Sequence, residues 1–373
     1  MRILHLAYED PRQPGAGGGS VRTREINRRL ARQHEVTAVV AGYPGARARD
    51  EDGVRWVPLG PRRGGSLGRL GYFAGLAAAV RAHPHDLLVE DFGAPFSVGF
   101  SPLLTRRPLV ASVQWLFAAE MRRKYHLPFD LVERLGLPLY HDFVAVSDWL
   151  ADELRRRRPG ARVTAVPNGV EPLAFEAPET SPAHLLYVGR LDLHHKGGDL
   201  LLEAMRHLRA ELGEATPPLL IAGDGPDEAA LRARAGALGL GDVVRFLGRI
   251  EGDEKYRLMA GAHAVLMPSR FETFGMVAVE AQAAGAPVVA FDVGPLSGVA
   301  GGGGARLVVP FSVEAFAAEV ARLVREPAWH AELRAQGRRW ARRYDWDALA
   351  AQQEAIYLGA LERHAAGRRR GAL

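Results

Sequence analysis

Arg190 and Lys196 are two cations in a short segment, residues 187–199, that is otherwise rich in small residues. An apolar run typical of a strand ends at Gly189, and a helical pattern begins near Gly198. Two cations beside a helix N-terminus form an anion site, and glycines let a phosphate approach the backbone. The segment therefore predicts a phosphate site, with a solvated basic loop as the alternative.

Glu272 and Glu280 stand eight residues apart in the segment 268–280. The helix that begins around Gly275 has unpaired N–H groups in its first turn, and these suit phosphate or sugar oxygens. Because this helix is apolar almost all round, a lone glutamate within it needs a partner. A carboxylate at 280 is able to accept two ribose hydroxyls, and Glu272 to accept sugar hydroxyls. The alternative is an acidic helix start with Glu280 facing solvent.

Three further glycine turns follow strand patterns. Residues 221–226 contain Gly223 and a proline at a helix start, as a Rossmann-type loop does. Residues 245–250 end a strand, and their backbone would meet the edge of a nucleobase. The alternative is that they only connect this strand to the following helix. Residues 15–20 follow the first strand and would let a diphosphate or sugar pack on the backbone, with a flexible linker as the alternative. They match the dinucleotide fingerprint only loosely.

Short apolar runs alternate with longer amphipathic stretches along the chain, which predicts α/β architecture with parallel sheets covered on both faces. Twelve strands are too many for one ordinary sheet, so we expect two Rossmann-like domains with ligands in the cleft between them. The boundary is expected at the turn of residues 167–172, with no strand or helix over 171–182. We expect strands at 2–7, 35–41, 86–90, 109–113, 142–146, 162–166, 184–189, 218–223, 243–247, 263–267, 287–291 and 306–309, and helices at 21–33, 148–157, 198–212, 227–238, 253–261, 276–284, 312–325 and 328–343.

The bulk composition is that of a folded globular protein, with 373 residues, of which 47% are hydrophobic and 24% charged. The sequence contains no run of about 18 apolar residues, so we expect no membrane-spanning helix. The first residues read as a strand rather than a signal peptide, so we expect a cytoplasmic protein. The absence of cysteine excludes disulfides, thiolate metal sites and a cysteine nucleophile.

Charge is distributed unevenly along the chain. Residues 1–168 carry 25 Lys and Arg against 17 Asp and Glu, whereas the remaining residues carry 23 against 26. The basic half suits a phosphate-bearing acceptor or an anionic membrane face, unless its arginines merely reflect GC-rich coding. The basic and apolar stretches 62–81 and 121–125 predict peripheral contact with an anionic membrane. No nucleic-acid-binding signature is found, so no nucleic-acid partner is expected.

Taken in chain order, these segments resemble the family-4 retaining glycosyltransferases of the GT-B fold. The resemblance spans nearly the whole chain and is most specific in the C-terminal half. It implies an acceptor domain of residues 1–168 with a C-terminal helix of about 346–373 crossing back to it, and a nucleotide-sugar donor domain of residues 169–345. The matching pieces are Gly17–Gly19, Val144–Asp148, Val166–Gly169, Gly189–Leu191, Lys196–Gly197, Ala222–Pro226, Phe246–Gly248, Phe271–Gly275, Glu280 and Tyr344–Trp346.

The resemblance implies a role for each matched residue. Arg190 and Lys196 would hold the donor diphosphate, Glu280 the ribose, and Glu272 the transferred sugar. Of these, Arg190, Lys196 and Glu272 are the expected catalytic residues. The remaining donor contacts would come from glycine turns, from backbone at the helix start and from the residue beside the base: Gly18, Gly19, Gly189, Gly223, Ile250, Phe274, Gly275 and Met276.

One departure from the family concerns the donor sugar. Many members have a histidine after the strand expected here at 109–113, and that histidine touches the sugar. This chain has Gln114 and Trp115 there, with His126 nearby as an uncertain substitute. The resemblance therefore leaves the identity of the sugar open, with a UDP-sugar favoured and GDP-mannose as the other donor.

The implied chemistry keeps the anomeric configuration of the sugar. Negative charge builds on the leaving diphosphate, and Arg190, Lys196 and helix N-termini would offset it, so neither a metal nor another cofactor is expected. No matched carboxylate is an obvious nucleophile, which favours front-face attack by a hydroxyl acceptor. Residues 50–52 and 345–347 imitate an Asp-x-Asp metal motif, but we place the first in a polar loop and reject both.

Three other functions fit parts of the pattern. A nonhydrolysing nucleotide-sugar epimerase would share the two-domain plan and the donor. A sugar-nucleotide sensor would keep the pocket without turnover. An NAD-dependent dehydrogenase fits worst, because the glycine fingerprint is loose and no acidic partner follows the second strand.

Overall fold

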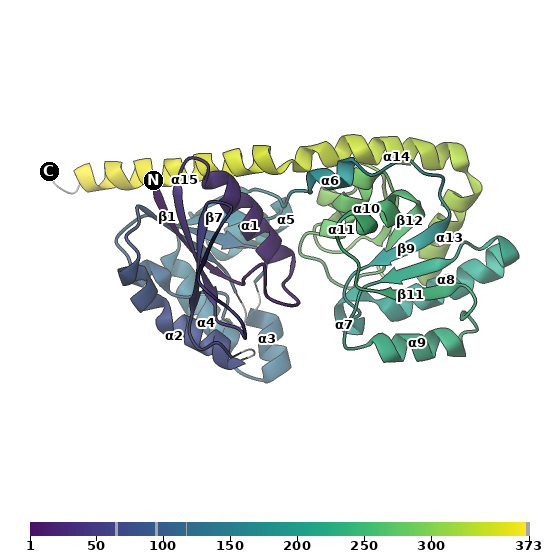
Figure 1. Cartoon of the computed structure of the whole chain (residues 1–373), viewed down its shortest axis with the longest axis horizontal. Coiled ribbons are helices and arrows are strands. Elements are labelled where there is room, and N and C mark those ends of the chain that lie inside the picture. Colours follow the sequence, from purple (N-terminus) through teal and green to yellow (C-terminus); the bar gives the residue numbers. More distant parts are fainter. Residues whose placement is uncertain (64–65, 94–95, 117, 371–373) are drawn as a thin grey trace. The chain divides into compact units, whose positions relative to one another are not determined.

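A computed structural model describes residues 1–63, 66–93, 96–116 and 118–370 (Figure 1). The chain divides into two units. Unit 1 comprises Met1–Asn168 together with Trp346–Leu373, and unit 2 comprises Gly169–Asp345. Each unit is built on one sheet with helices packed on it.

The sheet of unit 1 has eight strands in the order β3-β4-β2-β1-β5-β6-β7-β8. All pairs are parallel except β3 with β4. Outward from β5 the strands follow chain order, and on the other side of the sheet β2, β4 and then β3 follow β1, so the strand order reverses between β1 and β5. The strands are β1 (Arg2–Tyr8), β2 (Glu35–Ala41), β3 (Arg49–Glu51), β4 (Val54–Leu59), β5 (Leu87–Asp91), β6 (Leu109–Val113), β7 (Asp142–Ala145) and β8 (Arg162–Ala165).

Helices cover both faces of this sheet because successive residues of a strand point to opposite faces. Ile3 of β1 belongs to a buried cluster with Ile26 and Trp346, whereas its neighbour Leu4 belongs to another with Tyr72. The helices of unit 1 are α1 (Gly18–Leu30), α2 (Ser66–Ala82), α3 (Ala118–Tyr125), α4 (Phe129–Gly136), α5 (Asp148–Arg157) and α15 (Trp346–Arg370), with short 3-10 turns at Ser101–Leu103 and Leu137–Leu139.

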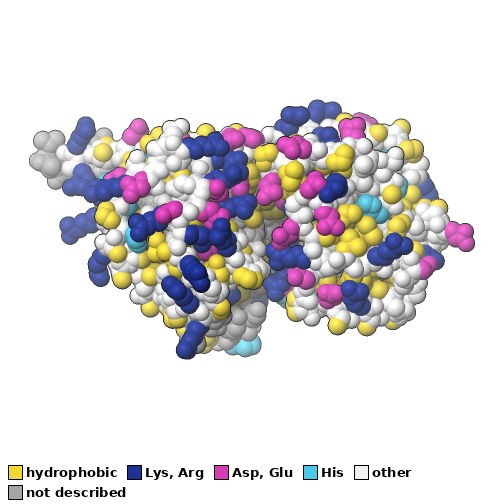
Figure 2. All heavy atoms as spheres, in the orientation of Figure 1, with side chains coloured by type: hydrophobic (Ala, Val, Ile, Leu, Met, Phe, Trp, Pro, Cys, Tyr) yellow, Lys and Arg dark blue, Asp and Glu magenta, His cyan; other side chains and the backbone are white. Residues whose placement is uncertain are grey.

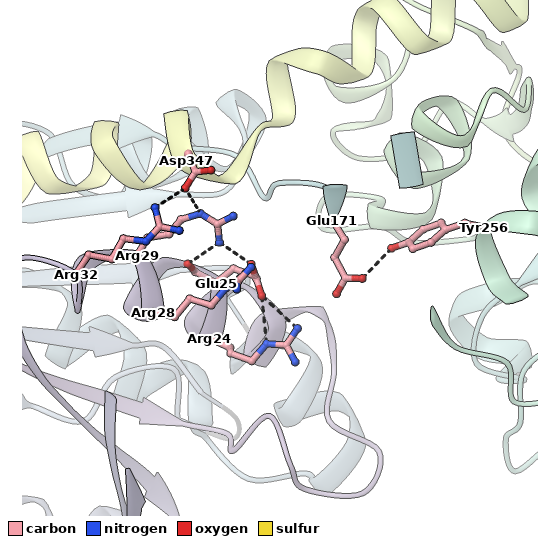
Figure 3. A network of polar contacts seen from close by, with 8 residues as sticks. All are labelled: Arg24, Glu25, Arg28, Arg29, Arg32, Glu171, Tyr256 and Asp347. Atoms are coloured by element: carbon pink, nitrogen blue, oxygen red, sulfur yellow. Dashed lines mark hydrogen bonds and ion pairs between the residues drawn. The ribbon is translucent and has the colours of Figure 1, made fainter. Parts of the chain in front are cut away.

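The C-terminal helix α15 is fastened to α1 by polar contacts as well as by apolar packing (Figures 1 and 3). Arg29 of α1 donates to Asp347 at 2.8 Å and also pairs with the buried Glu25 at 2.6 Å. Burial raises the pKa of Glu25, but hydrogen bonds from its arginine neighbours outweigh burial and leave the pKa below its usual value. The buried Arg22 donates to the Pro167 carbonyl and to Gln353 of α15. These contacts hold α15 and the end of the first segment in unit 1.

The sheet of unit 2 has six parallel strands in the order β11-β10-β9-β12-β13-β14. Chain order here reverses between β9 and β12. In doubly wound sheets the ligand crevice lies outside the carboxyl ends of the strands at such a reversal. The strands are β9 (His184–Val188), β10 (Leu219–Ala222), β11 (Val244–Gly248), β12 (Ala262–Met267), β13 (Val288–Phe291) and β14 (Ala305–Val308).

The core of unit 2 lies between this sheet and helices that include α8 and α13, where Leu201, Met205, Phe316 and Val320 are buried with strand residues such as Ile221. The helices are α6 (Pro172–Phe175), α7 (Leu193–Lys196), α8 (Gly198–Leu212), α9 (Glu228–Ala237), α10 (Gly252–Ala260), α11 (Met276–Ala284), α12 (Leu296–Val299), α13 (Val313–Arg325) and α14 (Pro327–Ala341), with 3-10 turns at Gly213–Ala215 and Arg342–Tyr344.

The expected fold class is confirmed, and each of the twelve expected strands lies within one residue of its predicted bounds. Two local predictions are wrong. The stretch 171–182 contains the one-turn helix α6, which starts at Pro172, a residue that suits the first position of a helix. Residues 50–52 do not form a loop, because β3 and β4 make a hairpin across Asp52 and Gly53, both with positive φ.

Candidate functional site

The two loops at the strand-order reversal of unit 2 carry three of the four residues on which the functional prediction centres. The loop after β9 carries Arg190 and Lys196, and the loop after β12 carries Glu272. The loops are joined directly, because the Arg270 backbone N–H donates to the His195 carbonyl at 2.8 Å. Segments far apart in the sequence thus form one surface at the carboxyl edge of the sheet.

Lys196 and Glu272 form an ion pair in this surface. Lys196 Nζ lies 2.5 Å from Glu272 Oε1, and the buried Ser269 hydroxyl donates to the same oxygen at 2.8 Å. The Glu272 side chain is 8% exposed but that of Lys196 is 31% exposed. The ammonium therefore keeps donors for a ligand while the carboxylate fixes its position.

The local backbone explains why Lys196 is held here. Asp192 caps the one-turn helix α7 by accepting from His194 and His195. Gly197 ends that turn with φ +63, and an added Cβ would lie 2.1 Å from the Pro268 carbonyl oxygen. Such a close approach of the two loops requires glycine at position 197.

A second clamp on the same loops comes from Arg270. Its guanidinium donates to both carboxylate oxygens of Asp199 at 2.7 Å and to the Leu193 carbonyl at 2.8 Å. Bidentate pairing of this kind fixes direction as well as distance. Arg270 therefore ties the loop after β12 to α7 and to the first turn of α8.

Arg190 is exposed, and its carbonyl accepts from the buried Tyr187 hydroxyl at 2.9 Å. This bond holds the backbone at the end of β9 while the guanidinium reaches solvent. Burial raises the pKa of Tyr187, with Glu272 and Asp192 adding to the effect, so the phenol stays protonated as a donor. Arg190 therefore has a backbone held by Tyr187 and an exposed side chain that is able to reach a ligand.

Glu280 lies inside α11 and has the partner that its burial demands. Lys255 Nζ of α10 is 3.0 Å from Glu280 Oε1. Burial raises the pKa of Glu280, Lys255 opposes this, and the nearby Glu171 adds to the rise. Glu171 itself accepts from the Tyr256 hydroxyl at 3.2 Å, as Figure 3 shows. The solvent-facing alternative for Glu280 is wrong, since the residue is only 9% exposed.

Glycines let the carboxyl ends of β9, β10 and β11 lie close together. Gly223 has φ +147, and a Cβ there would lie 1.9 Å from the Gly189 carbonyl oxygen. The Gly223 N–H donates to the Gly248 carbonyl at 2.7 Å, and the Gly189 N–H donates to the Ala222 carbonyl at 3.0 Å. Gly189 and Gly223, both predicted donor contacts, therefore lie together at one edge of the sheet, where a ligand would contact the backbone.

The helix α11 starts in the loop after β12, and the first N–H groups of a helix have no acceptor within that helix. Gly275 caps the helix with φ +91, and Met276 is the first helical residue. The Phe274 side chain is buried and packs edge-on against Tyr344, with ring centroids 5.8 Å apart, so only its backbone is available to a ligand. Ile250 is half-buried two residues after β11.

In unit 1 the predicted residues also follow strands. Gly18 is the first residue of α1, and a Cβ on Gly19 would lie 2.9 Å from Gln114 Nε2, which brings the glycine loop and Gln114 together. Trp115 follows as a half-buried residue. His126 is exposed at the end of α3, where its N–H donates to the Arg122 carbonyl.

Sequence reasoning missed the residues that hold the predicted ones. Ser269, Arg270 and Lys255 are the clearest cases, because each contacts Glu272, the Lys196 loop or Glu280. A buried carboxylate at Glu280 needs a partner, so the sequence indicates that a cation lies nearby. The spacing of residues along the sequence does not identify Lys255, which lies on another helix, as that cation.

Two other predictions concern metals and membranes. Within the described residues, no group of three or more His, Asp or Glu side chains is placed to hold a metal ion. Across the same ranges, every helix is too short or too polar to cross a bilayer. Of the stretches 62–81 and 121–125, Gly64 and Gly65 lie outside the described residues, as do the side chains at 66, 67, 124 and 125. Much of the apolar face of α2, including Tyr72 and Leu76, is buried in the core.

Two family models match consecutive parts of the chain. The model described as "Glycosyltransferase Family 4" matches residues 16–172, and that described as "Glycosyl transferases group 1" matches residues 173–342. The chain belongs to glycosyltransferase family 4. The resemblance found in the sequence motifs is thereby confirmed as family membership.

Curated relatives of this family-4 chain carry several names. It is 35% identical over 209 residues to a glycogen synthase of Mycobacterium tuberculosis, covering 54% of the chain and 50% of that protein. It is 34% identical over 266 residues to an MMP alpha-(1->4)-mannosyltransferase of Mycolicibacterium hassiacum, covering 70% of the chain and 61% of that protein. The chain therefore spans about half to three-fifths of the length of these relatives.

Solved structures show the GT-B fold of this family-4 chain. Sucrose-phosphate synthase from Thermosynechococcus elongatus superposes with a TM-score of 0.81 at 24% identity, covering 97% of this chain and 99% of that one. WaaG, a glycosyltransferase involved in lipopolysaccharide biosynthesis, gives 0.74 at 20% identity, covering 96% and 100%. At these identities the likeness establishes the fold and nothing finer.

Proposed function

We propose that this protein transfers a hexose-type sugar from a nucleoside diphosphate donor to a hydroxyl acceptor with retention of anomeric configuration. The observation that carries the proposal is the Lys196–Glu272 pair at the strand-order reversal of unit 2, beside the start of α11. A fixed ammonium, the exposed Arg190 and free helix N–H groups suit a diphosphate. Family membership supports the same chemistry.

Lys196, Arg190 and the start of α11 would act on the leaving group. As the bond between the sugar C1 and the diphosphate oxygen breaks, negative charge accumulates on the diphosphate. Preorganised cations and N–H groups stabilise that charge, and such stabilisation supplies much of the rate acceleration of many enzymes. These groups need no metal, so we propose that transfer continues in the presence of EDTA.

Glu280 and Glu272 would bind the two ends of the donor. The Glu280 carboxylate would accept from the ribose hydroxyls, with Lys255 keeping it ionised against the effect of burial. Glu272, placed by Lys196 and Ser269, would accept from hydroxyls of the transferred sugar. Gly18, Gly19, Gln114 and Trp115 of unit 1 would add contacts to the diphosphate, sugar or acceptor.

We propose front-face attack for the transfer step. The acceptor oxygen forms its bond to C1 on the face from which the diphosphate departs, and its proton passes to a diphosphate oxygen. No enzyme nucleophile is required, and the diphosphate leaves as the nucleoside diphosphate. NMR of the first-formed product tests this proposal, because an inverted anomer would contradict it.

A donor screen tests the proposal as a whole. The protein is incubated with UDP-glucose, other UDP-sugars and GDP-mannose, with EDTA in a parallel set, while nucleoside diphosphate release and donor binding are measured. We expect binding of one donor and release that increases with a cell extract containing acceptors. Failure to bind any donor would overturn the proposal, and binding without release would indicate a sensor. Mass spectrometry of the extract then identifies the acceptor.

Replacement of Lys196 tests its assigned role. We expect Lys196→Ala to lower the transfer rate by about 10²-fold or more, as for loss of a charged group that stabilises a transition state. Lys196→Arg should recover part of that loss. Arg206→Ala is the control, because Arg206 pairs with Glu203 on the solvent side of α8. Transfer rates and folded-state CD are compared, and wild-type activity of Lys196→Ala would refute the role.

A further inference from the structure

A cavity of about 290 Å³ lies in unit 1, and none of its lining residues is among the proposed donor or acceptor residues. Its lining includes Leu109, Asp142 and Arg162, which begin β6, β7 and β8, and Arg363 from α15. Gln114 follows the carboxyl end of β6, so the cavity lies at the opposite edge of the same sheet. One strand length, roughly 15 Å, separates the two edges.

Positive charge exceeds negative charge in this cavity. Arg162 Nε and Arg363 NH2 each lie 2.7 Å from Asp142 Oδ1, so one carboxylate serves two guanidinium groups. A guanidinium has five N–H donors, and both arginines therefore keep donors for another anion. Arg107 adds a third guanidinium, whose charge also acts on the Asp86 carboxylate.

His364 gives an independent indication of a ligand. It lines the cavity, and its Nε2 is buried without a hydrogen-bond partner in the described ranges. Buried polar side-chain atoms nearly always have a partner in folded proteins. An oxygen in the cavity would satisfy this nitrogen, and His141 places a second imidazole in the same lining.

The basic character continues along this edge of unit 1. A second cavity of about 300 Å³ shares Arg107 and is lined also by Arg2, Arg81 and Arg106. Figure 2 shows Lys and Arg side chains gathered over the end of α15 and the neighbouring part of unit 1. The positive electrostatic potential of these side chains raises the local concentration of anions.

We propose that the first cavity is a binding site for a phosphate group carried on a small organic moiety. Arg107, Arg162 and Arg363 donate to the phosphate oxygens, and His364 bonds one oxygen or a neighbouring hydroxyl. Leu109, Leu139 and Ala360 supply an apolar wall for the organic part. The volume equals that of roughly ten waters of about 30 Å³ each, which suits a small phosphate ester. The lining of this cavity shares no residue with the proposed donor site.

The first test measures binding of inorganic phosphate to the full chain by isothermal titration at low salt. Lys196→Ala serves as the background, because it weakens the proposed donor site and leaves any remaining phosphate binding there equal in all the variants. In that background we expect Arg107→Gln with Arg363→Gln to weaken binding by about tenfold or more, because charge-assisted hydrogen bonds are lost. Arg368→Gln is the matched control on the same helix and should leave binding within about twofold.

The second arm identifies the source of the phosphate. Flotation with phosphatidylglycerol vesicles is compared with flotation on phosphatidylcholine vesicles for the same variants. Binding of free phosphate that only the double variant weakens supports a soluble phosphate ester. Anionic-vesicle binding that only the double variant loses, without free-phosphate binding, supports a lipid headgroup. If neither free phosphate nor anionic vesicles bind, or if Arg368→Gln weakens binding as much as the double variant does, the proposed site is overturned.

Discussion

The strand order reverses at β1 and β5 in unit 1 and at β9 and β12 in unit 2, and acidic side chains lie near both reversals. In unit 1, Glu90 and Asp91 end β5 and have their polar partners within the same unit. Glu90 accepts from the Gly99 N–H and from the Tyr140 hydroxyl at 2.7 Å. Asp91 accepts from Thr23 at 2.7 Å and lies 3.1 Å from His5 Nε2.

In unit 2 the corresponding acids are paired with lysines instead. Lys196 is 31% exposed, whereas His5, the partner of Asp91, is 3% exposed. The Lys196 ammonium has three N–H donors, one of which goes to Glu272, so the others are available to a ligand. The His5 imidazole lies buried between Asp91 and Asn27, where a ligand at the surface does not reach it. The same kind of sheet thus has an edge with an accessible lysine in unit 2, whereas in unit 1 the acids at the edge face buried side chains of their own unit. Unit 1 is left with glycine backbone and amide groups to offer a ligand.

The largest expected effect is on stability, and it differs between a glycine of unit 2 and a glycine of unit 1. Gly223→Ala places a Cβ 1.9 Å from the Gly189 carbonyl oxygen at φ +147, so β9 and β10 must shift. We expect a loss of about 3 kcal/mol in unfolding free energy together with loss of donor binding. Gly15→Ala, in the loop of unit 1, has φ +79 but open space, and should cost about 1 kcal/mol. Urea unfolding of both variants checks this contrast, and equal losses would contradict it.

The next effect concerns the buried acid of unit 1. Burial raises the pKa of Glu90 to about 7, against hydrogen bonds that lower it. A raised pKa means that the folded state binds the proton more tightly, so this stabilisation is full below pH about 4.5 and is lost as pH rises through about 7. Relative to Glu90→Gln, the wild type should gain about 2 kcal/mol between pH 8 and pH 5.

Unfolding measured at several pH values tests this prediction. Glu362→Gln, an exposed change on α15 of the same unit, is the control and should show no such pH-dependent difference. A Glu90→Gln curve parallel to that of the wild type would mean that Glu90 is ionised throughout. The edge of unit 1 would then carry a buried negative charge, and the contrast between the two edges would weaken.

Most strands of both units could be predicted from sequence because buried parallel strands are continuous apolar runs, as at β9 and β12. The helices α2, α3 and α4 of unit 1 were not among the expected helices. The β3–β4 hairpin escaped prediction because β3 is three charged residues long, although Asp52-Gly53 is a turn signal. The predicted phosphate loop was visible because its cations and glycines lie close together in the sequence. Lys255 and Ser269 were not, since their contacts with Glu280 and Glu272 exist only after folding.

The smallest expected effect is at Gly19→Ala, where the new Cβ would lie 2.9 Å from Gln114 Nε2. The neighbour is the end of a flexible side chain, and alanine favours the helix, so stability should change by less than about 1 kcal/mol. If the edge of unit 1 only lines the donor, its KM should rise by about threefold with kcat little changed. In a Gln114→Ala background, Gly19→Ala should raise the KM for the donor by less than threefold, because the crowding is removed. A fall in kcat comparable to that of Lys196→Ala would place catalytic chemistry on unit 1 and end the contrast between the two edges.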